Sequence, residues 1–383
     1  MQKAHVLSGL ENLATVDEQL RGKRIGLMTH PNGVDHFGRS TIDIINETYN
    51  LSALFGVEHG VRGDLQAGDD VGTYVDPATG VTVYSLFGHS EESKMMTAEM
   101  TEAFDVFVFD MQDVGVRFYT YMYSLAYAMM ACAKAGKPMY VLDRLNPVGG
   151  LMREGTMHDA RFASFVGNYG LPSRTGLTIG ELALYFKDYL ELEGLELTVV
   201  PMVGWTRDMH LCDTDVIWPA PSPNCPTYNS SLCYAGTCVF EGTNLSEGRG
   251  TTTPFEVIGA PWVDQYALVR KLNSYGVEGV VYRPTTFMPT FHKHVGEICK
   301  GVQMHVTDPK NADLFKAGLY ILEAVRELYP DKLEFRGNDG HYFIDLLLGT
   351  DEYRLGMSAD ELIAKHAPGL EAFSEKVKKY LLY

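Results

Sequence analysis

Short apolar runs alternate with amphipathic stretches over residues 23–202. The clearest run, DVFVFD at 105–110, is apolar on both faces of an extended chain, as in a buried strand of a parallel sheet. Similar runs predict further strands at 23–29, 51–57, 81–87, 138–143 and 195–202. Apolar positions at helical spacing predict helices at 40–48, 97–104, 121–135 and 179–193.

Repeated strand–helix units predict an α/β fold, a Rossmann-like doubly wound and mostly parallel sheet covered on both faces. Beyond it, a smaller α+β region is expected, with strands at 279–282 and 301–307. Its helices are expected at 263–274, 312–329, 358–366 and 370–382. We therefore divide the chain into a Rossmann-like domain (1–205), an irregular joining segment (206–262) and a C-terminal domain (263–383).

The joining segment is rich in Gly, Pro, Ser, Thr and Asn and shows little periodicity. A long irregular stretch inside a compact protein is more often a functional loop than a spacer. Prolines stiffen its first half at 218–224, and glycines in its second half at 241–251 let the backbone approach a ligand closely. A binding wall is therefore favoured here over a purely structural role.

Charge and composition exclude several classes of function. The 383 residues carry 32 basic and 49 acidic side chains, a net charge of −17, which disfavours binding to nucleic acid or anionic lipid. No apolar run is long enough to cross a bilayer, and the N-terminus does not resemble a signal peptide. The expected location is the cytoplasm, or outside the cell if a leader was removed. Oligomeric state is not indicated.

The six cysteines, four of them within 212–238, show no Cys-x-x-Cys spacing. Zinc ligation is therefore a weak interpretation, and reduced thiols are favoured over a disulfide. His30, His36 and His59 also lack a metal-binding spacing. Phosphate-loop, zinc-protease and serine-hydrolase motifs are absent from the sequence.

Polar side chains follow three predicted strands, at the edge where ligands bind in open α/β sheets. Glu58 and His59, which stand among glycines, are candidates for general acid–base catalysis. A turn in which the Glu58 side chain caps backbone amides fits the sequence equally well. The stretch 110–121 combines carboxylates, an amide, an arginine and tyrosines, as carbohydrate sites do. For Asp113, an ion pair with Arg117 that braces the start of a helix is the favoured alternative. For 143–147, ion pairing with a neighbouring loop is favoured.

At these same clusters the sequence resembles the NamZ-type exo-β-N-acetylmuramidases, long described as a domain of unknown function. The resemblance covers essentially the whole chain in order. The matching strings are VEHGVRGDLQAGD (57–69), FDMQDVGVRFYTY (109–121), VLDRLNP (141–147), LTIGELA (177–183), WPAPSPNCPT (218–227), FEGTNLSEGRGTTTPFEVIGAPW (240–262) and GVQMHVTD (301–308). Val57, Thr175 and Cys225 depart from the family pattern, which has Pro, His and Met there.

The resemblance implies hydrolysis of the β-1,4 bond to a non-reducing terminal N-acetylmuramic acid in peptidoglycan fragments. It also implies catalysis by the Rossmann-like domain, a cleft closed by the C-terminal domain, and no metal or organic cofactor. The family's Glu-His-Gly motif falls on Glu58, His59 and Gly60.

Glycosidases usually employ two carboxyl groups, and Glu58 is assigned the acid–base role. Glu247 is favoured as its partner over Glu241, Asp113 and Asp110, and the substrate's own acetamido group is a further alternative. An arginine fork is expected to bind the lactyl carboxylate, with Arg117, Arg174 and Arg249 as candidates.

The predicted catalytic residues are thus Glu58, His59, Glu247 and Asp113. The predicted substrate-binding residues are Arg62, Asp110, Gln112, Arg117, Tyr119, Tyr121, Arg174, Asn224, Glu241, Asn244 and Arg249. Two rival interpretations remain: a non-catalytic sugar- or muropeptide-binding protein, and a metal-dependent hydrolase that uses His59 and the carboxylates.

Overall fold

A computed structural model describes residues 3–58, 60–63, 72–88, 90, 92–338 and 340–383. Its largest feature is a seven-stranded sheet in the order β3-β4-β2-β1-β5-β6-β9. All neighbouring strands in it are parallel except β3 and β4. The strands are β1 (Arg24–Thr29), β2 (Asn50–Gly56), β3 (Tyr74–Val75), β4 (Thr82–Ser85), β5 (Val106–Asp110), β6 (Met139–Leu142) and β9 (Leu197–Val200). The predicted α/β class is confirmed.

Both faces of β5 are covered, which explains its uninterrupted apolar sequence. Phe107 and Phe109 belong to the core that includes Met122 of α4, whereas Val106 and Val108 belong to a second core with Ile42 of α2. Successive side chains of a strand point to opposite faces, so each face needs its own helical cover. The helices of this part are α1 (Asp17–Leu20), α2 (Thr41–Thr48), α3 (Ala98–Glu102), α4 (Tyr121–Ala135) and α5 (Ile179–Tyr189).

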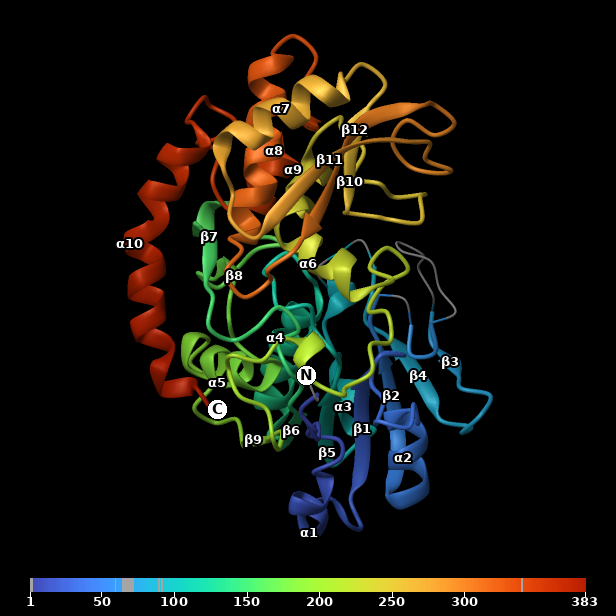
Figure 1. The fold of residues 1–383 in the computed structure, drawn as a ribbon. Coiled ribbons are helices and arrows are strands. Elements are labelled where there is room, and N and C mark those ends of the chain that lie inside the picture. Colours follow the sequence, from blue (N-terminus) through green and yellow to red (C-terminus); the bar gives the residue numbers. More distant parts are fainter. Residues whose placement is uncertain (1–2, 59, 64–71, 89, 91, 339) are drawn as a thin grey trace.

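A second, smaller lobe lies above the carboxyl ends of these strands (Figure 1). Its three-stranded antiparallel sheet has the order β10-β12-β11, formed by β10 (Val257–Ala260), β11 (Val280–Phe287) and β12 (Cys299–Val306). Its helices are α6 (Tyr228–Thr237), α7 (Gln265–Tyr275), α8 (Leu314–Leu328) and α9 (Phe343–Leu348). Two small antiparallel sheets of two strands each pair β7 (Glu154–Met157) with β8 (Pro172–Arg174) and β13 (Gly337–Asn338) with β14 (His341–Tyr342).

The joining segment is less irregular than its sequence predicts. It contains α6, a 3₁₀ helix at Cys238–Gly242 and strand β10. Every residue of α6 from Ser230 to Thr237 is buried. A helix buried on all sides has no polar face, so its sequence carries no amphipathic period, and the prediction of an irregular stretch was wrong here.

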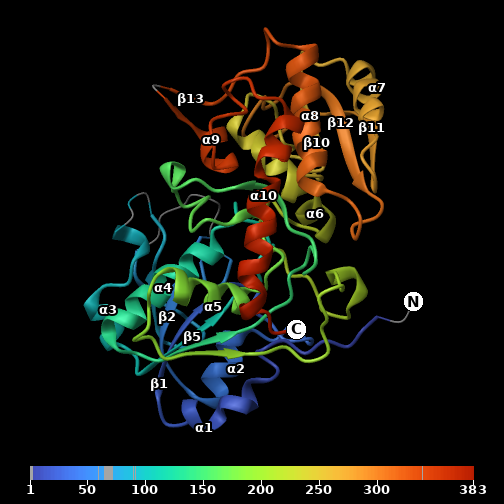
Figure 2. The same cartoon turned by 90° about the vertical axis from the view of Figure 1, so that its left-hand side faces the viewer.

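The two helices expected at 358–366 and 370–382 are one helix, α10 (Ala359–Val377), which runs from the small lobe down the side of the seven-stranded sheet (Figures 1 and 2). Pro368 lies inside it but is exposed, so water can satisfy the carbonyl that the missing N–H leaves free. The chain end is anchored by Tyr383, whose hydroxyl donates to Asp143 Oδ2 over 2.7 Å. None of the described helices has the length and apolar character needed to span a membrane.

Candidate active site

A cavity of about 580 Å³ lies between the seven-stranded sheet and the small lobe. The sheet side contributes Glu58, which follows β2, and Thr120, which precedes α4. The small-lobe side contributes Tyr234 of α6, Glu241 of the 3₁₀ helix and Arg249. The remaining lining residues are Phe87, Gly88, Lys94, Phe118, Tyr119, Phe165, Val166, Ser222, Asn224, Cys225, Phe255 and Phe343. Its size suits a small ligand such as a sugar.

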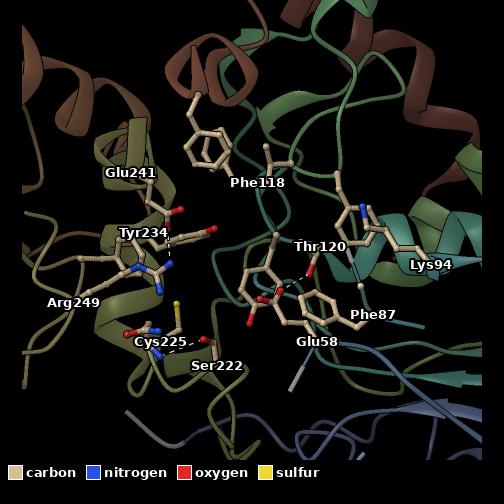
Figure 3. A pocket seen from close by; sticks show the side chains of 17 residues that line it. Glu58, Phe87, Lys94, Phe118, Thr120, Ser222, Cys225, Tyr234, Glu241 and Arg249 are labelled. Carbon is tan, nitrogen blue, oxygen red and sulfur yellow. Dashed lines mark hydrogen bonds and ion pairs between the residues drawn. The ribbon is translucent and has the colours of Figure 1, made fainter. Parts of the chain in front are cut away.

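Glu58 lines this cavity on the side opposite Glu241 and Arg249 (Figure 3). Thr120 Oγ1 donates to Glu58 Oε2 over 3.3 Å. Burial raises the pKa of Glu58 above its usual range, the nearby Glu241 raises it further, and the bond from Thr120 and the charge of Arg249 partly oppose the rise. A carboxyl group in this environment keeps its proton at a higher pH than an exposed glutamate, as a proton donor requires.

The opposite wall carries an ion pair. Arg249 Nη2 lies 2.7 Å from Glu241 Oε1, and both side chains are partly exposed to the cavity. Among the described lining residues, Glu58 and Glu241 are the two carboxylates, and Arg249 and Lys94 are the two cations. The cavity therefore combines a carboxyl group biased toward the protonated form, an ion-paired carboxylate, cations and aromatic faces.

A family model described as "Exo-beta-N-acetylmuramidase NamZ, N-terminal" matches residues 25–229, and its C-terminal counterpart matches 232–383. The chain belongs to the NamZ family. The two NamZ models meet between residues 229 and 232, whereas the domain boundaries at 205 and 262 stay predictions from the sequence.

Relatives of known sequence or structure agree with this family assignment. The peptidoglycan beta-N-acetylmuramidase NamZ of Bacillus subtilis (strain 168) is 46% identical and is matched over all of this chain and 92% of its own length. Crystal structures of two DUF1343 family proteins from Bacteroides fragilis NCTC 9343 each match 99% of both chains. One is 36% identical with a TM-score of 0.89. The other is 32% identical with a TM-score of 0.77.

Five of the residues predicted from the sequence line the cavity: Glu58, Tyr119, Asn224, Glu241 and Arg249. His59 lies outside the described residues. The other predicted residues are absent from the described lining, and each has a partner that explains its position.

Glu247 lies behind the small-lobe wall. Its side chain is fully buried and contacts Lys293 Nζ at 2.8 Å, His292 Nδ1 at 3.1 Å and Arg249 Nε at 3.3 Å. Burial alone would raise its pKa, but the bond from His292 and the charge of Lys293 lower it to about 2. Glu247 is thus a permanent anion that supports Arg249 from behind.

Asp113 is buried in the loop that follows the carboxyl end of β5. Its Oδ1 accepts a bond of 2.7 Å from the Gly115 N–H, while Oδ2 has no hydrogen-bond partner among the residues that the structure describes. Burial raises the pKa of Asp113 to about 7. The alternative of an ion pair with Arg117 is not observed, because the Arg117 guanidinium donates to backbone carbonyls instead.

Two candidate arginines for the lactyl group are fully buried elsewhere. Arg117 donates to the carbonyls of Thr156, Leu171 and Leu347 at 2.6, 2.8 and 2.7 Å, which ties the sheet-side loops to α9. Arg174 pairs with Glu154 and donates to the Val148 carbonyl. Of the three candidates, Arg249 is the one that lines the cavity.

Tyr119 and Tyr121 fix the proline-rich loop. Their hydroxyl groups donate to the same carbonyl oxygen, that of Pro221, over 2.6 and 2.7 Å. Tyr119 also lines the cavity, whereas Tyr121 is buried beneath it. The two rings meet edge to face at 4.8 Å, so the loop residues Ser222 and Asn224 rest on a rigid base.

The remaining predicted residues brace the fold. Asp110 forms a bidentate ion pair with Arg144 at 2.5 and 2.7 Å, the pairing between loops favoured for 143–147. Gln112 donates to the Leu145 carbonyl over 2.9 Å. Arg62 pairs with Asp43 and Asp76, and Asn244 donates to the Lys332 carbonyl.

The aromatic lining was largely missed from the sequence. Phe118 stands beside the predicted Tyr119, so its position in that string is a usable signal. Tyr234 and Phe343 come from segments with no chemical signature, and their presence depends on how the small lobe packs.

The candidate metal ligands also lie elsewhere. His5, His36 and Asp215 form the one group of three ligand-type side chains found close together among the described residues, and none of them lines the cavity. His36 Nε2 lies 3.0 Å from Asp215 Oδ1, so these groups pair with one another. All six cysteines are free, and five are buried.

Proposed function

We propose that this chain is an exo-β-N-acetylmuramidase that releases terminal N-acetylmuramic acid from the non-reducing end of peptidoglycan fragments. Membership of the NamZ family and the named activity of its Bacillus subtilis relative support the reaction. The structural observation that carries the proposal is a carboxyl group of raised pKa, Glu58, facing the Glu241–Arg249 pair across a sugar-sized cavity.

In the proposed mechanism, Glu58 donates its proton to the departing glycosidic oxygen as the glycosidic bond breaks. Burial keeps that proton in place until the bond breaks. A water molecule then adds to the anomeric carbon and gives up a proton that restores the acid form of Glu58. Glu241 supplies the second carboxylate. Arg249 pairs with Glu241, and the carboxylate of Glu241 stabilises the positive charge that develops on the sugar ring. This assignment replaces Glu247, whose carboxylate already contacts Lys293 and His292.

Recognition of the sugar follows from the rest of the lining. Arg249 is the proposed partner of the lactyl carboxylate, the group that distinguishes N-acetylmuramic acid from N-acetylglucosamine. Phe118, Tyr119 and Tyr234 offer apolar ring faces to the pyranose. In the cytoplasm, the compartment expected from the sequence, the reaction would recycle imported wall fragments.

Incubation of the purified chain with the disaccharide N-acetylmuramyl-β-1,4-N-acetylglucosamine tests the proposal. We expect release of both free sugars, and no release from a disaccharide with N-acetylglucosamine at the non-reducing end. Calorimetry on the same muramyl disaccharide identifies binding. Binding without release would instead support a sugar-binding protein and contradict the proposed activity.

A further inference from the structure

A groove on the surface of the small lobe continues outward from the cavity. It consists of two adjoining hollows of about 440 and 450 Å³. The first shares Phe343 with the cavity, and Arg336 lines both hollows. We call these two hollows together the outer groove.

The backbone also links the cavity to the outer groove. Glu241 of the cavity wall is followed by Gly242, whose carbonyl accepts a bond of 2.8 Å from the Arg336 N–H. The Arg336 carbonyl in turn accepts a bond of 2.9 Å from the N–H of Phe343. These two bonds fix the backbone of Arg336 next to Gly242 and Phe343, and Phe343 lines the cavity.

The charged side chains in the described lining of the outer groove, Lys293 and Arg336, are both cations, although the protein is acidic. The described lining contains His292, Lys293, His294, Arg336 and His341 and no Asp or Glu, in a chain of net charge −17. A local positive field in such a chain attracts anions against the overall charge.

Most of these side chains already have partners. Lys293 Nζ and His292 Nδ1 contact the buried Glu247, and His294 lies against the Asn244 carbonyl and 3.6 Å from Glu297. Arg336 differs, because it is exposed and forms no ion pair with any described residue. Its five N–H donors suit a carboxylate.

A rigid aromatic side chain lies beside Arg336. The Arg354 guanidinium stacks 4.1 Å above the Tyr342 ring and is itself held by Asp345, with Nη2 2.8 Å from Oδ2. Tyr342 and Phe343 thus form an apolar edge between the cavity and Arg336. An apolar edge that leads to a guanidinium with no ion-pair partner among the described residues suits a chain of sugars that carries a carboxylate.

We propose that the outer groove binds the leaving part of the substrate and that Arg336 pairs with a carboxylate on it. This inference rests on the proposed function. The carboxylate belongs either to the lactyl group of the next muramic acid or to an acidic stem peptide attached to it. Arg336 is a specificity-determining residue in this proposal, since it contacts the leaving glycan away from the bond that breaks.

Arg336→Gln tests the proposal, with Arg270→Gln as matched control because Arg270 is an exposed cation of the same lobe outside the outer groove. Four substrates are compared. An aryl β-N-acetylmuraminide and the muramyl disaccharide carry no carboxylate on the leaving side. The trisaccharide that ends in a second muramic acid carries one, and the same trisaccharide with an acidic stem peptide carries peptide carboxylates.

We expect Arg336→Gln to lower kcat/KM by about tenfold on carboxylate-bearing substrates, the scale of one hydrogen-bonded charge, and by less than about twofold on the first two. The stem peptide is joined to the second muramic acid as an amide of its lactyl carboxyl group. Loss on the peptide-free trisaccharide alone therefore identifies the lactyl group, loss on the peptide-bearing one alone identifies the stem peptide, and loss on both shows that Arg336 pairs with either carboxylate. Arg270→Gln should change none of the four.

Equal loss on all four substrates, or no loss on any, would overturn the proposal for Arg336. If the unaltered protein releases no sugar from any substrate, the proposed function fails instead. Calorimetric affinities of the same substrates for the unaltered protein and Arg336→Gln then decide the question, since the groove proposal requires weaker binding only where a carboxylate is present.

Discussion

Thr120 Oγ1 donates a 3.3 Å hydrogen bond to Glu58 Oε2, although Thr120 is the N-cap residue of α4. Its side chain makes no cap hydrogen bond to that helix. A threonine at the N-cap normally accepts a hydrogen bond from an amide of its own helix. Here the Thr120 hydroxyl instead bonds Glu58, and this bond sets the orientation of the buried carboxyl group.

Thr120→Val should move the pH dependence of kcat/KM to higher pH. The Thr120 bond stabilises the charged form of Glu58 and so lowers its pKa, and removing the bond raises that pKa. Because the acid acts when protonated, the falling alkaline limb of the profile should shift upward, with less than about a tenfold change at the optimum. Thr120→Ser keeps the donor and should leave the limb in place. A limb that stays fixed or moves to lower pH in the valine variant would contradict the contact.

Arg249→Lys should weaken binding of N-acetylmuramic acid by about tenfold, because lysine keeps the charge and loses the planar fork. Its effect on N-acetylglucosamine should stay below about twofold, as measured by calorimetry with the two free sugars. Lys94→Gln is the matched variant, since Lys94 is the other cation of the described lining. Equal weakening of both sugars by Arg249→Lys would refute the lactyl assignment, and a larger selective effect of Lys94→Gln would transfer it to Lys94.

Asp113→Asn should make the protein more stable than the unaltered chain at pH 8 and about equally stable at pH 4. Burial raises the folded-state pKa of Asp113 to about 7, whereas an exposed Asp titrates near about 3.9. An acid whose folded pKa is raised stabilises the protein below its unfolded pKa, and that contribution is lost as pH rises through both values. The unaltered protein should lose about 1.4 kcal/mol per pH unit relative to the variant between these limits.

Urea unfolding of both proteins at several pH values measures this difference. The shared buried acids Asp143 and Glu154, whose pKa values burial also raises to about 7, cancel in the comparison. A stability difference that does not change with pH would show that Asp113 is not a buried carboxyl with a raised pKa.

The sequence predicted the fold of the larger part because its signals are local. The run at 105–110 gave β5, and the helix at 121–135 agrees with α4 residue for residue. The position of Glu58 after a strand placed it at the carboxyl edge of the sheet, where the cavity lies. Each of these predictions depends only on the pattern of apolar and polar residues within a short stretch of the chain.

The parts that were missed depend on contacts between distant segments. Arg117 looked like a ligand-binding residue because its bonds to carbonyls 39, 54 and 230 positions away are invisible in its own string. Phe343 enters the cavity through the backbone bonds that join it to Arg336 and Gly242. Glu241 and Glu247 lie in similar sequence contexts. Their contacts distinguish them, because Glu241 lines the cavity whereas Glu247 is buried against Lys293 and His292.

The most direct test of the central claim compares Glu58→Gln on two leaving groups. A general acid raises the cleavage rate strongly when the leaving group is poor, as the hydroxyl group of a sugar is. It raises the rate little when the leaving group is a dinitrophenolate, which departs without a proton. We expect kcat/KM to fall by at least roughly a hundredfold on the muramyl disaccharide and by less than about tenfold on the dinitrophenyl β-N-acetylmuraminide. The urea concentration at the midpoint of unfolding should stay unchanged. Equal losses on both substrates, or near-normal cleavage of the disaccharide, would contradict the role of Glu58 as proton donor.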